Sequence, residues 1–239
     1  MAKHRARRSS PLYLPSAFEL FTPSKDLFIK YFNVFGILYI LPLLFWLHSW
    51  VDTPAHGHHY WTRTSDANYG WTLPGGYNAA FIGFSILWFL IAIIGGTIVQ
   101  IMTQRAQLDA AEDKEPTLDR AWQTVKEMWP NMVKLFIAMI IIIGIGFVLL
   151  IIPGLFMIKR YMFAPYVMLD KKCGVKEALE GSHELSNKNT GAVWGVIGVM
   201  FLLSIVGIVP IIGSLASFIL GALYSIAPAI RYQQLKKLP

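Results

Sequence analysis

Long apolar runs alternate with short polar segments along this chain. Five runs, at 30–50, 78–103, 132–152, 192–209 and 212–230, approach or exceed the roughly 20 residues that a helix needs to cross a hydrocarbon core of about 30 Å. A sixth run, 155–169, has only fifteen residues and includes Lys159, Arg160 and Pro165. This pattern predicts an all-α, polytopic membrane protein.

The positive charges indicate how these runs are oriented. If all six cross the membrane and both termini lie inside, the inside segments hold eighteen of the twenty-one Lys and Arg residues. The outside segments then hold only Arg63, and the other two are Lys159 and Arg160. Because cytoplasmic loops carry an excess of Lys and Arg, we expect six transmembrane helices, in three hairpins, with both termini in the cytoplasm.

A short segment recurs before each predicted hairpin. Residues 24–30 (SKDLFIK) are similar to 182–188 (SHELSNK), and a weaker copy lies at 125–131. This recurrence predicts one membrane domain, 1–239, made of three units at 12–103, 117–170 and 174–233. The first unit has a long outer loop at 51–77, whereas Pro153-Gly154 and 210–213 predict tight outer turns in the other two.

The second and third units begin with amphipathic patterns. The apolar positions of these predicted inner-face helices are Leu118, Trp122, Val125, Trp129, Leu179 and Leu185. Thr117 is expected to cap the first helix and Pro130 to end it. Such helices either lie in the headgroup plane of the membrane or pack as soluble caps on the base of the bundle.

Composition supports the membrane class and limits the chemistry. Hydrophobic residues make up 55% of the 239 residues and charged residues only 15%, against about 25% charged in soluble proteins. The net charge of +7 is not arranged as a basic stripe with exposed aromatics, so nucleic acid is not an expected partner. The single Cys173 cannot form an internal disulfide, and no motif predicts a cofactor.

At several of these positions the chain resembles a family of bacterial six-span membrane proteins labelled glycerophosphoryl diester phosphodiesterase membrane-domain-like. The resemblance rests on 152–154 (IPG), on Arg160 followed by Ala164-Pro165, and on 177–179 (EAL) leading into Ser182, Leu185 and Lys188. It implies the six-helix architecture and a bacterial cytoplasmic membrane. It implies no catalytic residues, because the phosphodiesterase active site belongs to a separate soluble domain. The chain departs from the family at His183, where Trp is frequent, and at Lys188-Asn189, where a basic-Gly pair is frequent.

Lys159 and Arg160 are the leading candidates for a functional site. A charge at bilayer depth costs roughly 2.5–3.5 kcal/mol on insertion scales, so such residues usually face a cavity, pair with an acid or extend to the headgroups. No acidic residue lies within a predicted span. The pair is therefore expected either to contact an anionic lipid or solute, or to extend to the outer headgroups.

A second candidate site is a histidine cluster in the predicted outer loop. His56 with His58 or His59 provides the nitrogen ligands that Zn²⁺ or Cu²⁺ prefers, with Asp52 or Asp66 as a further ligand. Histidine runs in loops are common without a metal, so this cluster is a hypothesis only.

Three functions are consistent with these features. The first is a non-enzymatic membrane protein that binds, senses or moves lipids or small anionic solutes. The second is a membrane scaffold whose inner-face helices dock a partner protein. The third, an enzyme acting on lipid headgroups, lacks a nucleophile or metal set within the spans. Membrane lipids are the expected partners, and the sequence leaves a homo-oligomer or a protein partner open.

Overall fold

The computed structural model describes residues 14–51, 79–208 and 212–238. These residues form ten helices and no strand, which confirms the predicted all-α class for this part of the chain. The helices are α1 (Phe21–Lys30), α2 (Phe32–Val51), α3 (Ala79–Ala111), α4 (Leu118–Leu149), α5 (Ile151–Tyr161), α6 (Ala164–Lys171), α7 (Val175–Lys188), α8 (Thr190–Val206), α9 (Ile212–Tyr224) and α10 (Ala227–Lys236).

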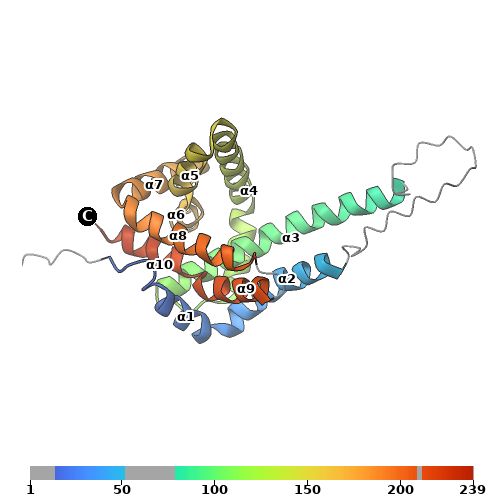
Figure 1. Ribbon diagram of the computed structural model, residues 1–239, viewed down its shortest axis with the longest axis horizontal. Coiled ribbons are helices and arrows are strands. Elements are labelled where there is room, and N and C mark those ends of the chain that lie inside the picture. The colour runs from blue at the N-terminus through green and yellow to red at the C-terminus, as the bar shows by residue number, and fades with distance from the viewer. Residues whose placement is uncertain (1–13, 52–78, 209–211, 239) are drawn as a thin grey trace, which may run out of the picture.

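Three segments far apart in sequence form the centre of the structure (Figure 1). They are the C-terminal part of α3, α6 and α10, and each has fully buried residues, such as Leu108, Val167 and Tyr232. In α6 all six residues from 164 to 169 are buried. The rings of Tyr166 and Tyr232 stack with their centroids 6.1 Å apart. The core of the protein therefore lies among segments that contain both apolar and polar residues.

Each pair of these central segments is joined by a side-chain hydrogen bond. The Tyr166 hydroxyl donates to Gln107 Oε1 at 2.8 Å, the Tyr232 hydroxyl to Asp170 Oδ2 at 2.7 Å, and Gln233 Nε2 to Glu112 Oε1 at 2.8 Å. These bonds link α3 to α6, α6 to α10 and α10 to Glu112, the residue that follows α3. Because a buried polar group without a partner costs about 1–3 kcal/mol, the three bonds favour one mutual register of the segments.

Amphipathic helices surround this centre. α1 packs against α9 and α10, α4 against α3, and α7 against α5 and α6. In α7 the buried positions are Ala178, Ser182 and Ser186, which share one side of the helix. The amphipathic helix predicted at the start of the third unit, with Leu179 and Leu185 within 175–185, is therefore present as α7, and its less polar side contacts the rest of the protein.

Two helix breaks have the same local structure. Between α5 and α6, the Ser182 hydroxyl donates to the Arg160 carbonyl at 2.8 Å and accepts from the Phe163 N–H at 3.2 Å. Between α9 and α10, the Ser24 hydroxyl donates to the Leu223 carbonyl at 2.7 Å and accepts from the Ile226 N–H at 3.2 Å. The breaks read YMFAP at 161–165 and YSIAP at 224–228.

Proline explains both breaks. Pro165 and Pro228 lie in the first turns of α6 and α10. A proline there has no N–H to continue the preceding helix, and its ring clashes with the carbonyl four residues earlier. The two serines provide the hydrogen bonds that the interrupted helices lose.

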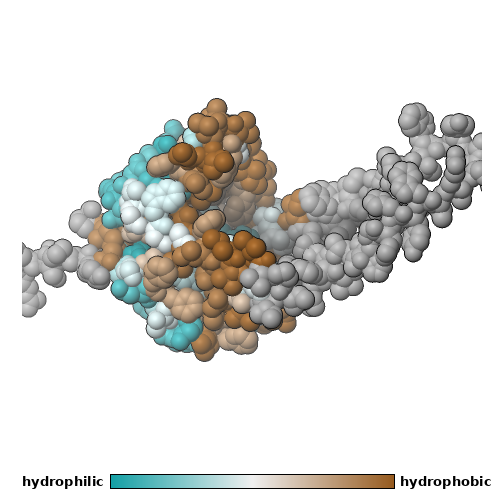
Figure 2. Space-filling view, in the orientation of Figure 1, coloured by the Kyte–Doolittle hydropathy of each residue, from teal (hydrophilic) through white to brown (hydrophobic). Residues whose placement is uncertain are grey.

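Large apolar side chains are exposed around the junction of α4 and α5. Val148 is 88% exposed, and the next four residues, 149–152, are between 67% and 70% exposed. Figure 2 shows hydrophobic residues gathered over the α4–α5 end, with hydrophilic residues gathered around α7. Monomeric soluble proteins rarely expose an apolar surface of this extent.

Within the described ranges, two stretches are long and apolar enough to span a membrane, Leu118–Leu149 and Gly213–Lys236. A third is added if α7 and α8, which meet at a bend of 101°, count as one broken span. These helices are compatible with a place in a membrane.

The chain reverses between α4 and α5 at Leu150, so the turn predicted at Pro153-Gly154 is wrong. Leu150 is extended, with φ −167° and ψ 155°, and Pro153 and Gly154 lie in the first turn of α5. Proline is tolerated there because the first N–H groups of a helix have no partner within it. The helices approach closely at Gly146, where an added Cβ would lie 3.0 Å from Gly154 Cα.

Pro130 does not end the helix that begins at Thr117. The predicted cap is confirmed, since Thr117 Oγ1 accepts from the Arg120 N–H at 3.4 Å, but α4 continues through Pro130 to Leu149. Pro130 removes one helical hydrogen bond. Met128 and Met132, on either side of Pro130, are buried in the core, and their packing keeps this part of α4 helical.

The predicted span 155–169 is wrong as a single helix, because its residues are divided between α5 and α6. α5 has 11 residues, which at 1.5 Å per residue is about 16 Å, too short to cross a core of about 30 Å alone. Residues 164–169 of α6 are buried by the rest of the protein. The predicted run 212–230 is likewise divided, between α9 and α10.

Removing the Ser182 hydroxyl is expected to destabilise the protein. Ser182→Ala leaves the buried Phe163 N–H without its partner and leaves the Arg160 carbonyl with only the longer bond from Ser186 Oγ at 3.5 Å. The free energy of unfolding should fall by about 2 kcal/mol. Ser24→Ala should cost a similar amount, because its two hydrogen bonds are equivalent. Thermal and denaturant unfolding of the detergent-solubilised protein measure both effects.

Ser204→Ala is the matched control for these variants. The exposed Ser204 hydroxyl bonds the Met200 carbonyl of its own helix at 2.9 Å. Its removal should leave stability nearly unchanged. If Ser182→Ala is as stable as Ser204→Ala, the bridge does not hold the break together.

Asp170 is expected to make stability depend on acid pH. Burial raises the pKa of this carboxyl, but hydrogen bonds from Lys236 and Tyr232 outweigh burial and lower the pKa below its ordinary value. Because the pKa of Asp170 is lower in the folded than in the unfolded protein, its ionised form stabilises the folded state at pH values above the ordinary pKa of about 4. This stabilisation is lost as the pH falls through the lower pKa of the folded protein. Asp170→Asn should remove this component and cost about 1–2 kcal/mol near neutral pH.

Glu127→Gln is the control for Asp170→Asn. The Glu127 carboxylate lies 2.8 Å from Lys172 Nζ, and both side chains are more than half exposed. Surface ion pairs contribute little and are screened by salt. Unfolding across the acid range should therefore change more in Asp170→Asn than in Glu127→Gln, and equal changes would contradict a special role for Asp170.

Candidate functional site

Lys159 lies where α5, α7 and α8 meet. Its side chain is buried, with 6% of the residue exposed. Its amine donates to Thr190 Oγ1 at 3.1 Å and to Asn187 Oδ1 at 3.4 Å. An ammonium has three donors, and both acceptors here are neutral groups. The positive charge is therefore held in a buried position by dipoles rather than by a carboxylate.

Arg160 follows directly, and its guanidinium is not paired with an acid. The guanidinium carbon lies 5.7 Å from the centre of the Tyr161 ring, and Nε is buried without a hydrogen-bond partner. The ion pairs between described residues include neither Lys159 nor Arg160. Two adjacent cations thus lie at this junction with no compensating carboxylate within 4.0 Å among the residues that the structure describes.

His183, on α7, belongs to the same cluster. Its Nε2 lies 3.1 Å from Asn187 Nδ2, and its Nδ1 is buried without a partner. If Asn187 donates to Nε2, the proton of the neutral ring is on Nδ1, which then has no acceptor. Burial, followed by the positive charges of Arg160 and Lys159, lowers the pKa of His183 below its ordinary value. The nearby cations therefore favour the neutral imidazole.

The three side chains form a site that is rich in donors and poor in acceptors. We name Lys159, Arg160 and His183 the basic cluster. An anion placed against it would accept hydrogen bonds from charged groups, which are about twice as strong as bonds between neutral groups. Phosphate and carboxylate oxygens are the acceptors that such donors recognise best.

The structure brings the predicted pair to an unexpected position. Lys159 bonds to residues at the end of α7 and the start of α8, next to the 182–188 segment that the sequence assigns to the inner face. Lys159 is more buried than Arg160.

The predicted inner-face positions lie mainly against the protein core. Val125 is buried, and Trp129, Leu179 and Leu185 are partly buried against one core cluster, while Leu118 packs on another. Trp122 is the exception, with 44% of the residue exposed. This arrangement favours helices that pack on the base of the structure over helices whose apolar sides face lipid.

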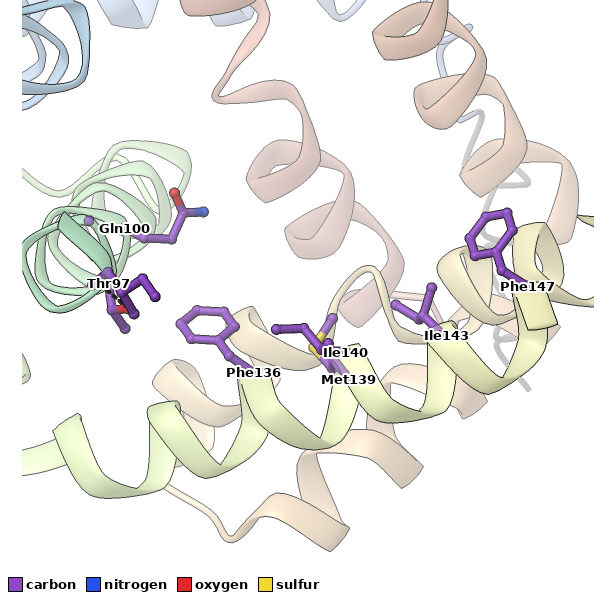
Figure 3. Close-up of a pocket in the computed structure, with 10 residues that line it drawn as sticks. Thr97, Gln100, Phe136, Met139, Ile140, Ile143 and Phe147 are labelled. Atoms are coloured by element: carbon purple, nitrogen blue, oxygen red, sulfur yellow. Dashed lines mark hydrogen bonds between the residues drawn. The ribbon is translucent and has the colours of Figure 1, made fainter. Parts of the chain in front are cut away.

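A groove of about 740 Å³ lies between α3 and α4 (Figure 3). Apolar side chains of α4 between Phe136 and Phe147 face Thr97 and Gln100 of α3, and the Phe136 ring points toward Thr97. The Thr97 hydroxyl donates to the Ile93 carbonyl of its own helix at 2.7 Å. The groove therefore offers a hydrocarbon-like lining with few polar groups.

The proposed metal ligands His56, His58 and His59 lie outside the described residues. Among the residues that are described, no group of three His, Cys, Asp or Glu side chains could hold a metal ion. No role was predicted from the sequence for His183, Asn187 or Thr190. A signal was available in the recurrence of the 182–188 segment, which includes His183 and Asn187.

Comparison with known proteins gives no matching family model, no similar curated protein and no similar solved structure.

Proposed function

We propose that this protein is a non-enzymatic, multi-pass membrane protein that binds an anionic lipid at the basic cluster. The observation that carries the proposal is the cluster itself, in which Lys159, Arg160 and His183 present charged or unpaired donors without a carboxylate. A buried cation is costly without a partner. A lipid phosphate provides the missing charge and the missing acceptors together.

The groove between α3 and α4 favours a lipid over a polar solute. A transporter of polar solutes needs a polar path, whereas the groove is lined almost entirely by apolar side chains. An acyl chain matches such a lining because burying each CH₂ group contributes about 0.8 kcal/mol.

The proposed architecture has six membrane segments and both termini on the cytoplasmic side of a bacterial inner membrane. The charge distribution supports it, with α5–α6 and α9–α10 as broken segments. The equivalent serine bridges support an internal repeat, in which Ser24 and Ser182 occupy matching positions of two units. The second unit has Val125 at that position, and α4 packs on a continuous α3.

A membrane scaffold is the second candidate function. It is favoured by Trp122, which is exposed on α4 with Lys126 Nζ 5.8 Å from its ring centre. Exposed aromatic residues are enriched in protein interfaces. In this alternative a partner protein docks on α4, and the basic cluster serves only to join α5 to α7 and α8.

Arg160→Gln is expected to reduce the anionic lipid that copurifies with the protein. Loss of a charged donor should weaken phosphate binding by about tenfold. Quantitative lipid analysis by mass spectrometry of the purified protein measures the effect. Lys176→Gln is the matched control, because Lys176 is a highly exposed cation on α7 that pairs with Glu180.

Unchanged anionic lipid in Arg160→Gln would contradict the proposal. Lys159→Met separates binding from folding, since it keeps the length of the side chain and removes the charge. If Lys159 only joins helices, this variant loses stability and keeps its lipid. If Lys159 binds lipid, the lipid is lost from protein that remains folded.

Binding of a phosphodiester lipid is expected to strengthen as the pH falls. A bound anion favours the charged imidazole of His183, whose pKa in the free protein is lowered. Binding should therefore take up a proton, and the affinity should rise as the pH falls from about 8 to about 5.5. Phosphatidylglycerol nanodiscs are suitable because the charge of this lipid is constant over the range. His183→Asn should remove the dependence, and an equal pH dependence in this variant would exclude His183.

A further inference from the structure

A second basic cavity, of about 540 Å³, lies beside the N-terminus of α8. It is lined by residues 14–17, which precede α1, by the segment 188–192, by Gly195 and by Arg231 of α10. Apart from Thr190, which Lys159 contacts, none of these residues belongs to or bonds the basic cluster. The cavity is thus a separate candidate site, formed where the beginning of the described chain meets its last helix.

Arg231 is the first feature that indicates an anionic ligand. It is 1% exposed, and its terminal nitrogens donate to the Pro15 carbonyl at 2.7 Å and to Gln234 Oε1 at 3.0 Å. Its Nε is buried without a partner. Glu19 is the acid that acts on it electrostatically, from beyond ion-pair distance, and this side chain is exposed. The charge of Arg231 is therefore buried against neutral acceptors.

The N-terminus of α8 is the second feature. This helix has 17 residues, and the side chain of its N-cap residue, Asn189, makes no capping hydrogen bond. The first N–H groups of a helix have no partner within it, and the helix dipole places positive potential there. Lys188 adds a cation to the cavity lining; its side chain is 56% exposed, and its amine pairs with the Glu184 carboxylate at 3.1 Å on the surface of α7. Helix N-termini with nearby Arg and Lys are common phosphate sites.

Two glycines shape the cavity. A Cβ added to Gly195 would lie 3.0 Å from Ala17 Cβ, so α8 and the N-terminal segment touch at this position. One turn earlier, a Cβ added to Gly191 would meet no atom within 4 Å. The close contact at Gly195 therefore sets the distance between the walls, and the missing side chain at Gly191 leaves room between them.

We propose that this cavity binds the phosphate group of a phosphate ester or of free phosphate, held by Arg231, Lys188 and the N–H groups at the start of α8. The site is independent of lipid binding at Arg160. Its donors come from the end of α7, the start of α8 and α10, and residues 14–17 complete the lining of the cavity.

The test uses the full chain and measures binding to two probes. Inorganic phosphate is titrated into detergent-solubilised protein against chloride at equal ionic strength, and phosphatidylglycerol is presented in nanodiscs. Gly191→Leu places a side chain in the cavity from a position where an added Cβ meets no atom within 4 Å. Gly198→Leu is its control, since Gly198 is on the same helix, has equally open space around an added Cβ and lies outside the cavity. Arg231→Gln removes the buried charge.

Gly191→Leu and Arg231→Gln should weaken binding by about tenfold or more, while Gly198→Leu and Arg160→Gln leave binding at this site unchanged. Binding of both probes identifies phosphate as the recognised group, and binding of the lipid alone identifies a headgroup.

If Arg231→Gln does not fold, Gly191→Leu decides, because it keeps every charge. Unchanged affinity in Gly191→Leu, or no binding of either probe to the wild type, overturns the proposal. Loss of lipid only in Arg160→Gln would overturn this site and leave the basic cluster intact.

Discussion

The hydroxyl of Ser182 is the contact on which the arrangement of the site depends. Pro165 prevents α5 from continuing into α6, because a proline removes one helical N–H and clashes with the preceding turn. Two backbone groups of the broken helix then need partners in a buried position, and Ser182 bonds both. This fixes α7 against the break and brings His183 and Asn187 beside Lys159.

An equivalent pair of hydrogen bonds at Ser24 joins α1 to the break between α9 and α10. Ser24 lies on α1 and bridges the break between α9 and α10. Nearby, the Tyr224 hydroxyl donates to the Ala17 carbonyl at 2.9 Å, and Arg231 bonds Pro15. These bonds hold the N-terminal segment against α8 and α10. The cavity beside Gly191 forms between these three parts of the chain.

Both candidate sites contain a buried cation without a carboxylate partner. Elsewhere in the described chain, buried charges are compensated, as Asp109 is by Arg105 at 2.7 Å and Arg120 at 3.3 Å. At Lys159 and Arg231 the acceptors are neutral oxygens, and neither these two residues nor Arg160 pairs with a described carboxylate. A buried cation with neutral partners is costly, and this cost is the physical reason for proposing an anionic ligand at both positions.

Much of the local structure could be predicted from the residues alone. Helical periodicity placed the apolar side of 175–185 correctly, and Thr117 before a helical pattern indicated the start of α4. The consequences of the prolines could not be predicted in the same way. Pro130 is tolerated within a helix whose flanks are packed, whereas Pro165 follows a break that a distant serine stabilises.

By itself, the sequence determined the all-helical class, the apolar character of the long segments and the basic pair in a region without acids, because these depend on composition and on neighbours along the chain. Only the tertiary structure decided that 155–169 is divided into two helices, that α6 is buried in protein, and that His183 and Thr190 lie beside Lys159. These outcomes depend on which distant groups satisfy a broken backbone and a buried charge. That information lies in contacts between residues far apart in the chain.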